Sequence, residues 1–171
     1  MESQAAPAPG EALYRELLWV HDALRADLER VRALADETLA GAEPDRVEAE
    51  VADLRTNSPL WRLKTGCLAH CGFVHRHHRL EDVALFPALL RANPDLAPVV
   101  EKLAADHRSI AGRVEDVEAA VRALGDGDGR GGETARPQVA SALDRLAGEL
   151  LEHLGYEEEQ VAETMRAMTE L

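Results

Sequence analysis

The stretch VVEKLAADHRSIAGRVEDVEAAVRAL, residues 99–124, is the part of the sequence that most clearly determines the fold. Apolar residues recur in it at alternating intervals of three and four, the spacing that places side chains on one face of an α-helix. The stripe consists of Val100, Leu103, Ile110, Val114, Val117, Val121 and Leu124. His107 occupies the one stripe position where an aliphatic residue is missing.

Similar spacing on both sides of this segment predicts three further long helices. The expected long helices cover about 11–40, 60–92, 97–124 and 134–168, with a short helix over 47–54. Breaks rich in Gly, Pro and Asn separate them, and residues 1–10 read as a disordered tail. Four amphipathic helices with short connections predict an all-α protein, an up-down-up-down antiparallel four-helix bundle over residues 11–171. On the second long helix, the core face is expected to carry Leu63, Cys67, Val74, Ala84 and Ala88.

Composition excludes several classes of function. The 171 residues include 19 Lys and Arg against 32 Asp and Glu, a formal net charge of −13. Such a surface is poorly suited to nucleic acid or to anionic membranes, which attract basic residues. The sequence has no apolar run long enough to cross a membrane and no secretory signal pattern at its start, which favours a cytoplasmic location. Cys67 and Cys71, four residues apart on a helix, fit a disulfide poorly.

Each predicted long helix carries a histidine on its apolar stripe. These histidines are His21, His77, His107 and His153. Two of them have a glutamate four residues later, namely Glu81 and Glu157, and such pairs lie one turn apart on the same helix face. Because Glu is rarely buried unless it is paired or bound to metal, the pattern predicts a polar cluster inside the bundle.

Counting from the connections places these polar residues at one depth. His107 lies 22 residues before Gly129 and His153 lies 24 after it, while Glu81 and His107 lie about equally far from the turn near Pro94. Four imidazoles and two carboxylates at one level suit two metal ions with bridging glutamates. This mixture of ligands fits Fe or Mn, and Zn can also use it.

These residues resemble the hemerythrin-like HHE cation-binding family. The resemblance spans about residues 12–170, and its motifs are His21-Asp22, the run from His77 to Asp82 followed by Leu85-Phe86-Pro87, His107, and His153 through Glu157. It implies a non-haem centre of two Fe ions, with the ligands His21, His77, Glu81, His107, His153 and Glu157. The sequence departs from the oxygen-carrying hemerythrins on the third helix. Those proteins have a second histidine four residues from the first, whereas Leu103 and Ala111 stand at that spacing from His107.

The absence of this histidine from the third helix, together with the gain of the carboxylate Glu157 on the fourth, bears on function. More carboxylate donation favours the ferric state and oxidative reactivity over reversible carriage of O2. We therefore expect a protein that binds or reacts with O2, peroxide or NO; the alternative is a module that stores iron or senses iron or oxygen without turnover. Any enzymatic activity would consume peroxide or NO, not hydrolyse or transfer groups. A metal-free hydrogen-bond network is a third hypothesis, and both a monomer and a homodimer remain open.

Several residues near these motifs have alternative interpretations. His70 lies two turns before His77 on the same stripe and suits an extra ligand, a group that contacts a ligand from outside, or a capped core histidine. His78 competes with His77 as a ligand, and we expect His75, His78 and Asp82 on the outer face or just outside the ligands. We expect Trp19 and Trp61 to serve packing or an interface, and Tyr14 and Tyr156 are candidate neighbours of the site.

Overall fold

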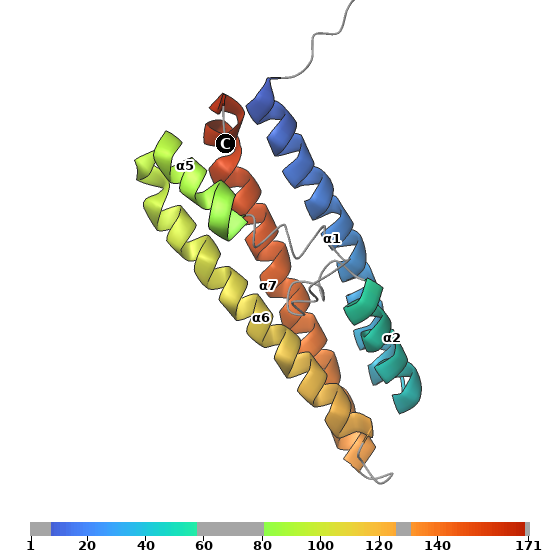
Figure 1. The fold of residues 1–171 in the computed structure, drawn as a ribbon. Coiled ribbons are helices and arrows are strands. Elements are labelled where there is room, and N and C mark those ends of the chain that lie inside the picture. The colour runs from blue at the N-terminus through green and yellow to red at the C-terminus, as the bar shows by residue number, and fades with distance from the viewer. Residues whose placement is uncertain (1–7, 58–80, 126–130, 170–171) are drawn as a thin grey trace, which may run out of the picture.

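The computed structural model describes residues 8–57, 81–125 and 131–169, and these form helices and their connections, with no strand among them (Figure 1). The elements are α1 (Pro9–Leu39), α2 (Pro44–Asn57), the π-helical turn η1 (Glu81–Leu85), α5 (Phe86–Ala92), the 3₁₀ turn η2 (Pro94–Leu96), α6 (Ala97–Gly125) and α7 (Gly131–Ala167). The predicted all-α class is confirmed for the described residues. Of the predicted helix over 60–92, the part before residue 81 lies outside them, and so do Cys67, Cys71, Trp61, His70, His75, His77 and His78.

The long helix α7 lies between α1 and α6 and contacts both (Figure 1). Both neighbours run antiparallel to α7, so residues far apart in the sequence face one another. The stripe of α6 is buried as predicted at Leu103, Ile110, Val114, Val117, Val121 and Leu124, while Val100 is half-buried. Aliphatic residues at helical spacing thus account for this part of the core.

The buried apolar side chains form two clusters, one toward each end of the long helices. Each long helix contributes to both. The residues that mark the change from one cluster to the other are Leu17 and Val20 on α1, Leu103 and Ile110 on α6, and Val161 and Leu154 on α7. His107 and Glu157 lie between the members of their pairs, and His21 directly follows Val20. The polar residues therefore lie at one level between two apolar layers.

The turn η1 corrects one sequence prediction. Ala84 was expected on the core face, but it is exposed and Leu85 is buried instead, whereas Glu81 is buried as predicted. A π-helical turn closes its hydrogen bonds over five residues instead of four, so it takes up one extra residue and shifts the face that follows. Ala88 is buried as predicted.

The start of α1 lies very close to the end of α7, and the contact is made at Gly10. A Cβ atom on Gly10 would lie 2.2 Å from the carbonyl oxygen of Met165 and 2.6 Å from that of Met168. Only glycine, which has no Cβ, allows the first turn of α1 to lie this close to the last turns of α7. The helix begins at Pro9, two residues before the predicted start.

Candidate metal centre

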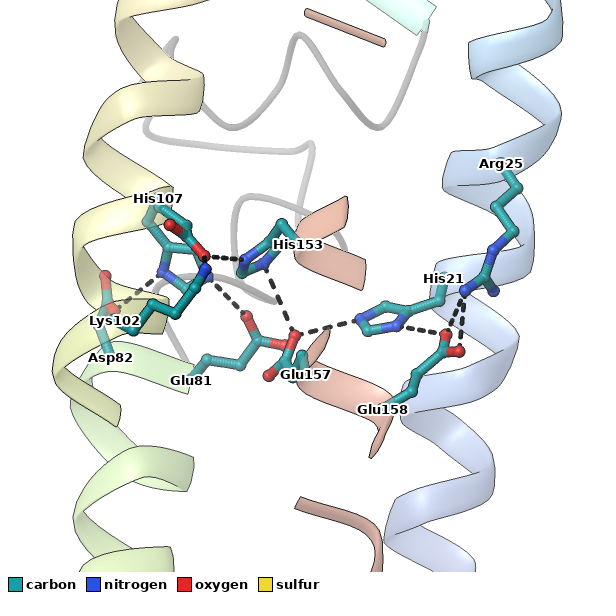
Figure 2. A network of polar contacts seen from close by, with 10 residues as sticks. His21, Arg25, Glu81, Asp82, Lys102, His107, His153, Glu157 and Glu158 are labelled. Carbon is teal, nitrogen blue, oxygen red and sulfur yellow. Dashed lines mark hydrogen bonds and ion pairs between the residues drawn. The ribbon is translucent and has the colours of Figure 1, made fainter. Parts of the chain in front are cut away.

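Four segments of the chain bring five of the six predicted site residues together in the core (Figure 2). The five are His21 on α1, Glu81 on η1, His107 on α6, and His153 and Glu157 on α7. His21, Glu81, His153 and Glu157 are at most 1% exposed, and the side chain of His107 is 7% exposed. The sixth predicted residue, His77, lies outside the described residues.

Imidazole nitrogens and carboxylate oxygens converge in this cluster. The Oε2 atom of Glu157 lies 3.5 Å from Nε2 of His21 and 3.7 Å from Nε2 of His153. The Nε2 atom of His107 lies 3.5 Å from Oε2 of Glu81. These separations exceed the usual hydrogen-bond range of about 2.7–3.2 Å. They are close to the roughly 3.4 Å expected between two ligands that bind one ion at about 2.1 Å in tetrahedral geometry.

Three of these residues form the tightest group that could hold a cation. One potential ligand atom from each of His21, Glu81 and Glu157 lies within 4.8 Å of the other two, and all three residues are buried. Imidazole nitrogen together with carboxylate oxygen suits Fe, Mn or Zn better than Ca²⁺ or Mg²⁺, which prefer oxygen alone. The donor set of the described residues therefore fits a transition-metal ion.

The electrostatics of the cluster also favour a positive occupant. Burial raises the pKa of Glu81 well above its usual value, and the nearby charge of Glu157 raises it further, against a lowering effect from His21. Burial alone would lower the pKa of His21, but its contacts with Glu157 and Glu158 outweigh burial and raise it to about 9. Two carboxyl groups thus share one buried space, where a cation would stabilise their charged forms.

His153 behaves in the opposite way. Burial lowers its pKa to about 4, because the positive form is poorly solvated there, and the charge of Glu157 offsets this only in part. His153 is therefore neutral at pH 7, the form in which an imidazole binds a metal ion.

Each described histidine of the cluster has a carboxylate beside its other ring nitrogen (Figure 2). The Nδ1 atom of His21 lies 2.8 Å from Oε1 of Glu158, and Nδ1 of His107 lies 3.0 Å from Oδ1 of Asp82. For His153, the corresponding distance to Oδ2 of Asp106 is 3.7 Å. Metal-binding histidines commonly have such a partner, which fixes the ring orientation and leaves the other nitrogen to the metal.

Sequence reasoning expected Asp82 on the outer face or just outside the ligands, and it missed the other outer residues. These are Asp106, Glu158 and Arg25, whose guanidinium donates to both carboxylate oxygens of Glu158 at 2.8 Å. Arg25 follows His21 by four residues, the spacing of neighbours on one helix face, and this was the available signal. Its contact with Glu158 depends on how α1 and α7 are aligned, which a single sequence does not reveal.

Aromatic rings border the His107 side of the cluster. The ring of Phe86 stacks on His107 at a centroid distance of 5.5 Å, and His107 meets His153 edge to face at 4.8 Å. The hydroxyl of Tyr14 donates to the backbone carbonyl of Glu158 at 3.2 Å, so this tyrosine is a neighbour of the outer residues. Tyr156 instead lies beneath the ammonium group of Lys102, at 4.4 Å from the ring centroid. Trp19 is 62% exposed.

Comparison with known protein families identifies a match over most of the chain. The family described as "Hemerythrin HHE cation binding domain" matches residues 12–165 of the 171. No curated protein gives a significant match, and neither does any solved structure. Among the helices of the described residues, none combines the length and the apolar character required to cross a membrane.

Proposed function

The chain belongs to the hemerythrin HHE cation-binding family, and from this premise we propose that it is a non-haem di-iron protein that binds or reacts with a small oxidant such as O2, peroxide or NO. The observation that carries the proposal is the convergence of His21, Glu81 and Glu157 on one buried point. We also propose that the chain completes an up-down-up-down four-helix bundle, with residues 60–92 as its second long helix. This arrangement would bring His77 into the same level as Glu81, because the two are one helical turn apart.

We assign the metal ligands as His21, His77, Glu81, His107, His153 and Glu157. Glu157 lies between His21 and His153, and Glu81 lies beside His107, so each carboxylate would hold metal together with the histidines next to it. The six side chains cannot fill six positions on each ion, and the remaining positions would be open to a small molecule. When bound, iron would supply the redox chemistry, and Mn or Zn are the alternatives for this donor set.

The chain around the ligands controls access and charge. Apolar clusters on both sides of the polar level exclude bulk water and favour small, weakly polar molecules such as O2 or NO. His153 stays neutral and ready to bind metal, while the carboxylates of Glu81 and Glu157 balance the charge of the ions. Relative to the oxygen-carrying hemerythrins, this donor set has one histidine fewer and one carboxylate more, which would favour the ferric state and oxidative reactivity over reversible oxygen carriage.

Iron loading and peroxide turnover test this proposal. The purified protein is loaded with Fe(II) without oxygen, and iron per chain, the absorption spectrum and peroxide consumption are measured. We expect about two iron ions per chain, the number that His and Glu donors in a helical bundle commonly hold, and a charge-transfer band that changes when peroxide is added. Glu157→Gln should lose both the bound iron and the band. Glu159→Gln should keep both, because Glu159 is exposed and lies about half a helical turn after Glu157. A wild-type protein without bound iron would contradict the proposal.

The second candidate is a module that stores iron or senses iron or oxygen without significant turnover. It is favoured by the burial of Glu81 and Glu157, because carboxylates at one buried point tie the stability of the fold to metal binding. The same experiment separates the two candidates. A sensor would bind iron and gain stability but consume little peroxide, whereas the oxidant-reactive protein would consume it repeatedly.

A further inference from the structure

The outer partners of the three described histidines differ in how firmly they are held. Glu158 and Asp82 lie within hydrogen-bond distance of His21 and His107, at 2.8 and 3.0 Å, whereas Asp106 is 3.7 Å from His153. The side chain of Glu158 is 19% exposed, while that of Asp82 is 45% exposed. Of these hydrogen bonds, the one to His21 is therefore the better shielded from water.

Glu158 is also anchored from two other directions. Arg25 donates from one guanidinium nitrogen to both of its carboxylate oxygens at 2.8 Å, and the hydroxyl of Tyr14 holds its backbone carbonyl at 3.2 Å. Arg25 and Tyr14 are on α1, as is His21, whereas Glu158 is on α7. The polar chain from Arg25 through Glu158 to His21 therefore ties α1 to α7 at the level of the cluster (Figure 2).

We infer that Arg25 and Glu158 are positioning residues that hold His21 in the one orientation and tautomer that can bind the metal. A carboxylate only accepts hydrogen bonds, so Nδ1 of His21 carries the proton and Nε2 is directed toward Glu157. Arg25 keeps the carboxylate of Glu158 on the outer side of the ring. The inference rests on the proposed metal centre and adds two residues of this chain to it.

The pair of Arg25 and Glu158 makes His21 and His107 differ in how firmly their rings are held. At the other end, the Asp82 partner of His107 is more exposed to water, which weakens its hydrogen bond. His21 should accordingly be the more rigidly fixed ligand. Loss of Arg25 should weaken metal binding, because Arg25 acts on the ligand candidate His21 through the carboxylate of Glu158.

Metal affinity in matched variants tests the inference. The affinity of the full chain for Fe(II) is measured without oxygen by competition with a chelator, and Co(II) absorption bands report the geometry of the ligands. Glu158→Gln should weaken binding about 10- to 100-fold, the usual effect of removing such an outer partner. Arg25→Gln should cause a smaller loss with altered Co(II) bands, and Arg25→Lys should restore part of it, because lysine keeps the charge but not the guanidinium geometry.

Arg113→Gln is the matched control. Arg113 is as exposed as Arg25 and also joins two long helices, through an ion pair of 2.6 Å with Glu149. Glu149 lies one turn before His153 and is not one of the outer partners described above, which are Glu158, Asp82 and Asp106. This variant should keep wild-type metal affinity and Co(II) bands. Equal losses in Arg25→Gln and Arg113→Gln, or wild-type affinity in Glu158→Gln, would overturn the inference while leaving the metal site intact. A wild-type protein that binds neither metal would overturn the proposed function itself.

Discussion

Glu81 and Glu157 are carboxylates that lie almost completely buried beside the imidazoles of three helices. Carboxylates are rare in a hydrophobic core, because removing a carboxylate from water costs several kcal/mol. Two of them buried together therefore indicate a function. We therefore expect their burial to lower the stability of the fold when no cation is bound.

Replacing Glu81 by glutamine should therefore change stability and metal binding in opposite directions. Glu81→Gln keeps the shape of the side chain and removes a charge that burial and Glu157 both disfavour. We expect the metal-free protein to become more stable, because a neutral amide is less costly to bury than a carboxylate, and the stabilisation by added Fe(II) to disappear. Urea unfolding with and without metal measures both. A variant that is less stable and still responds to Fe(II) would contradict the account.

The pKa of His21 predicts how stability depends on pH. Its value is raised from 6.5 to about 9 in the folded, metal-free protein, so its contribution is fully present below pH 6.5 and is lost as pH rises through 9. Unfolding with a chelator present should show stability falling over this range, by at most roughly 3 kcal/mol from this group. Stabilisation by metal should instead grow with pH, because the metal displaces the proton of His21. His21→Gln should flatten the first trend; an unchanged slope would contradict it.

Among the elements, η1 is the one that brings Glu81 to the core. Its π-helical turn contains one residue more than an α-helical turn, and the exposed Ala84 lies within it. Deleting Ala84 should restore α-helical spacing and rotate the residues before it by about 100°, which moves Glu81 away from the cluster. We expect helix content by circular dichroism to be kept and Fe(II) binding to be lost, with Ala84→Ser as the control that keeps both. Wild-type affinity in the deletion variant would contradict this role of η1.

The contact between the ends of α1 and α7 gives a prediction about packing. A Cβ on Gly10 would meet backbone oxygen atoms of α7, which cannot move aside as a flexible side chain would. Gly10→Ala should destabilise the protein by about 1–3 kcal/mol, the usual cost of overpacking. Gly112→Ala has open space around its Cβ and should stabilise the protein by up to about 1 kcal/mol through helix propensity. Chemical denaturation of the two variants makes the comparison, and equal effects would contradict it.

At the scale of the whole molecule, a polar level separates two apolar clusters. The sequence was sufficient to predict this level, because helix rise is uniform and the histidines interrupt otherwise aliphatic stripes. It was not sufficient to predict that Ala84 is exposed, because a π-helical turn in η1 changes the spacing locally. The pairing of Arg25 with Glu158 was also missed, since the register of α1 against α7 depends on contacts such as that of Gly10.

The most direct test of the central claim is the position of iron in crystals of the Fe(II)-loaded protein, located by anomalous diffraction at the iron absorption edge. The account predicts two iron peaks in the buried level, within about 2.0–2.3 Å of ligand atoms that include those of His21, Glu81 and Glu157. Iron found only on the acidic surface, or a cluster that binds no iron while its histidines and carboxylates bond to one another, would contradict it.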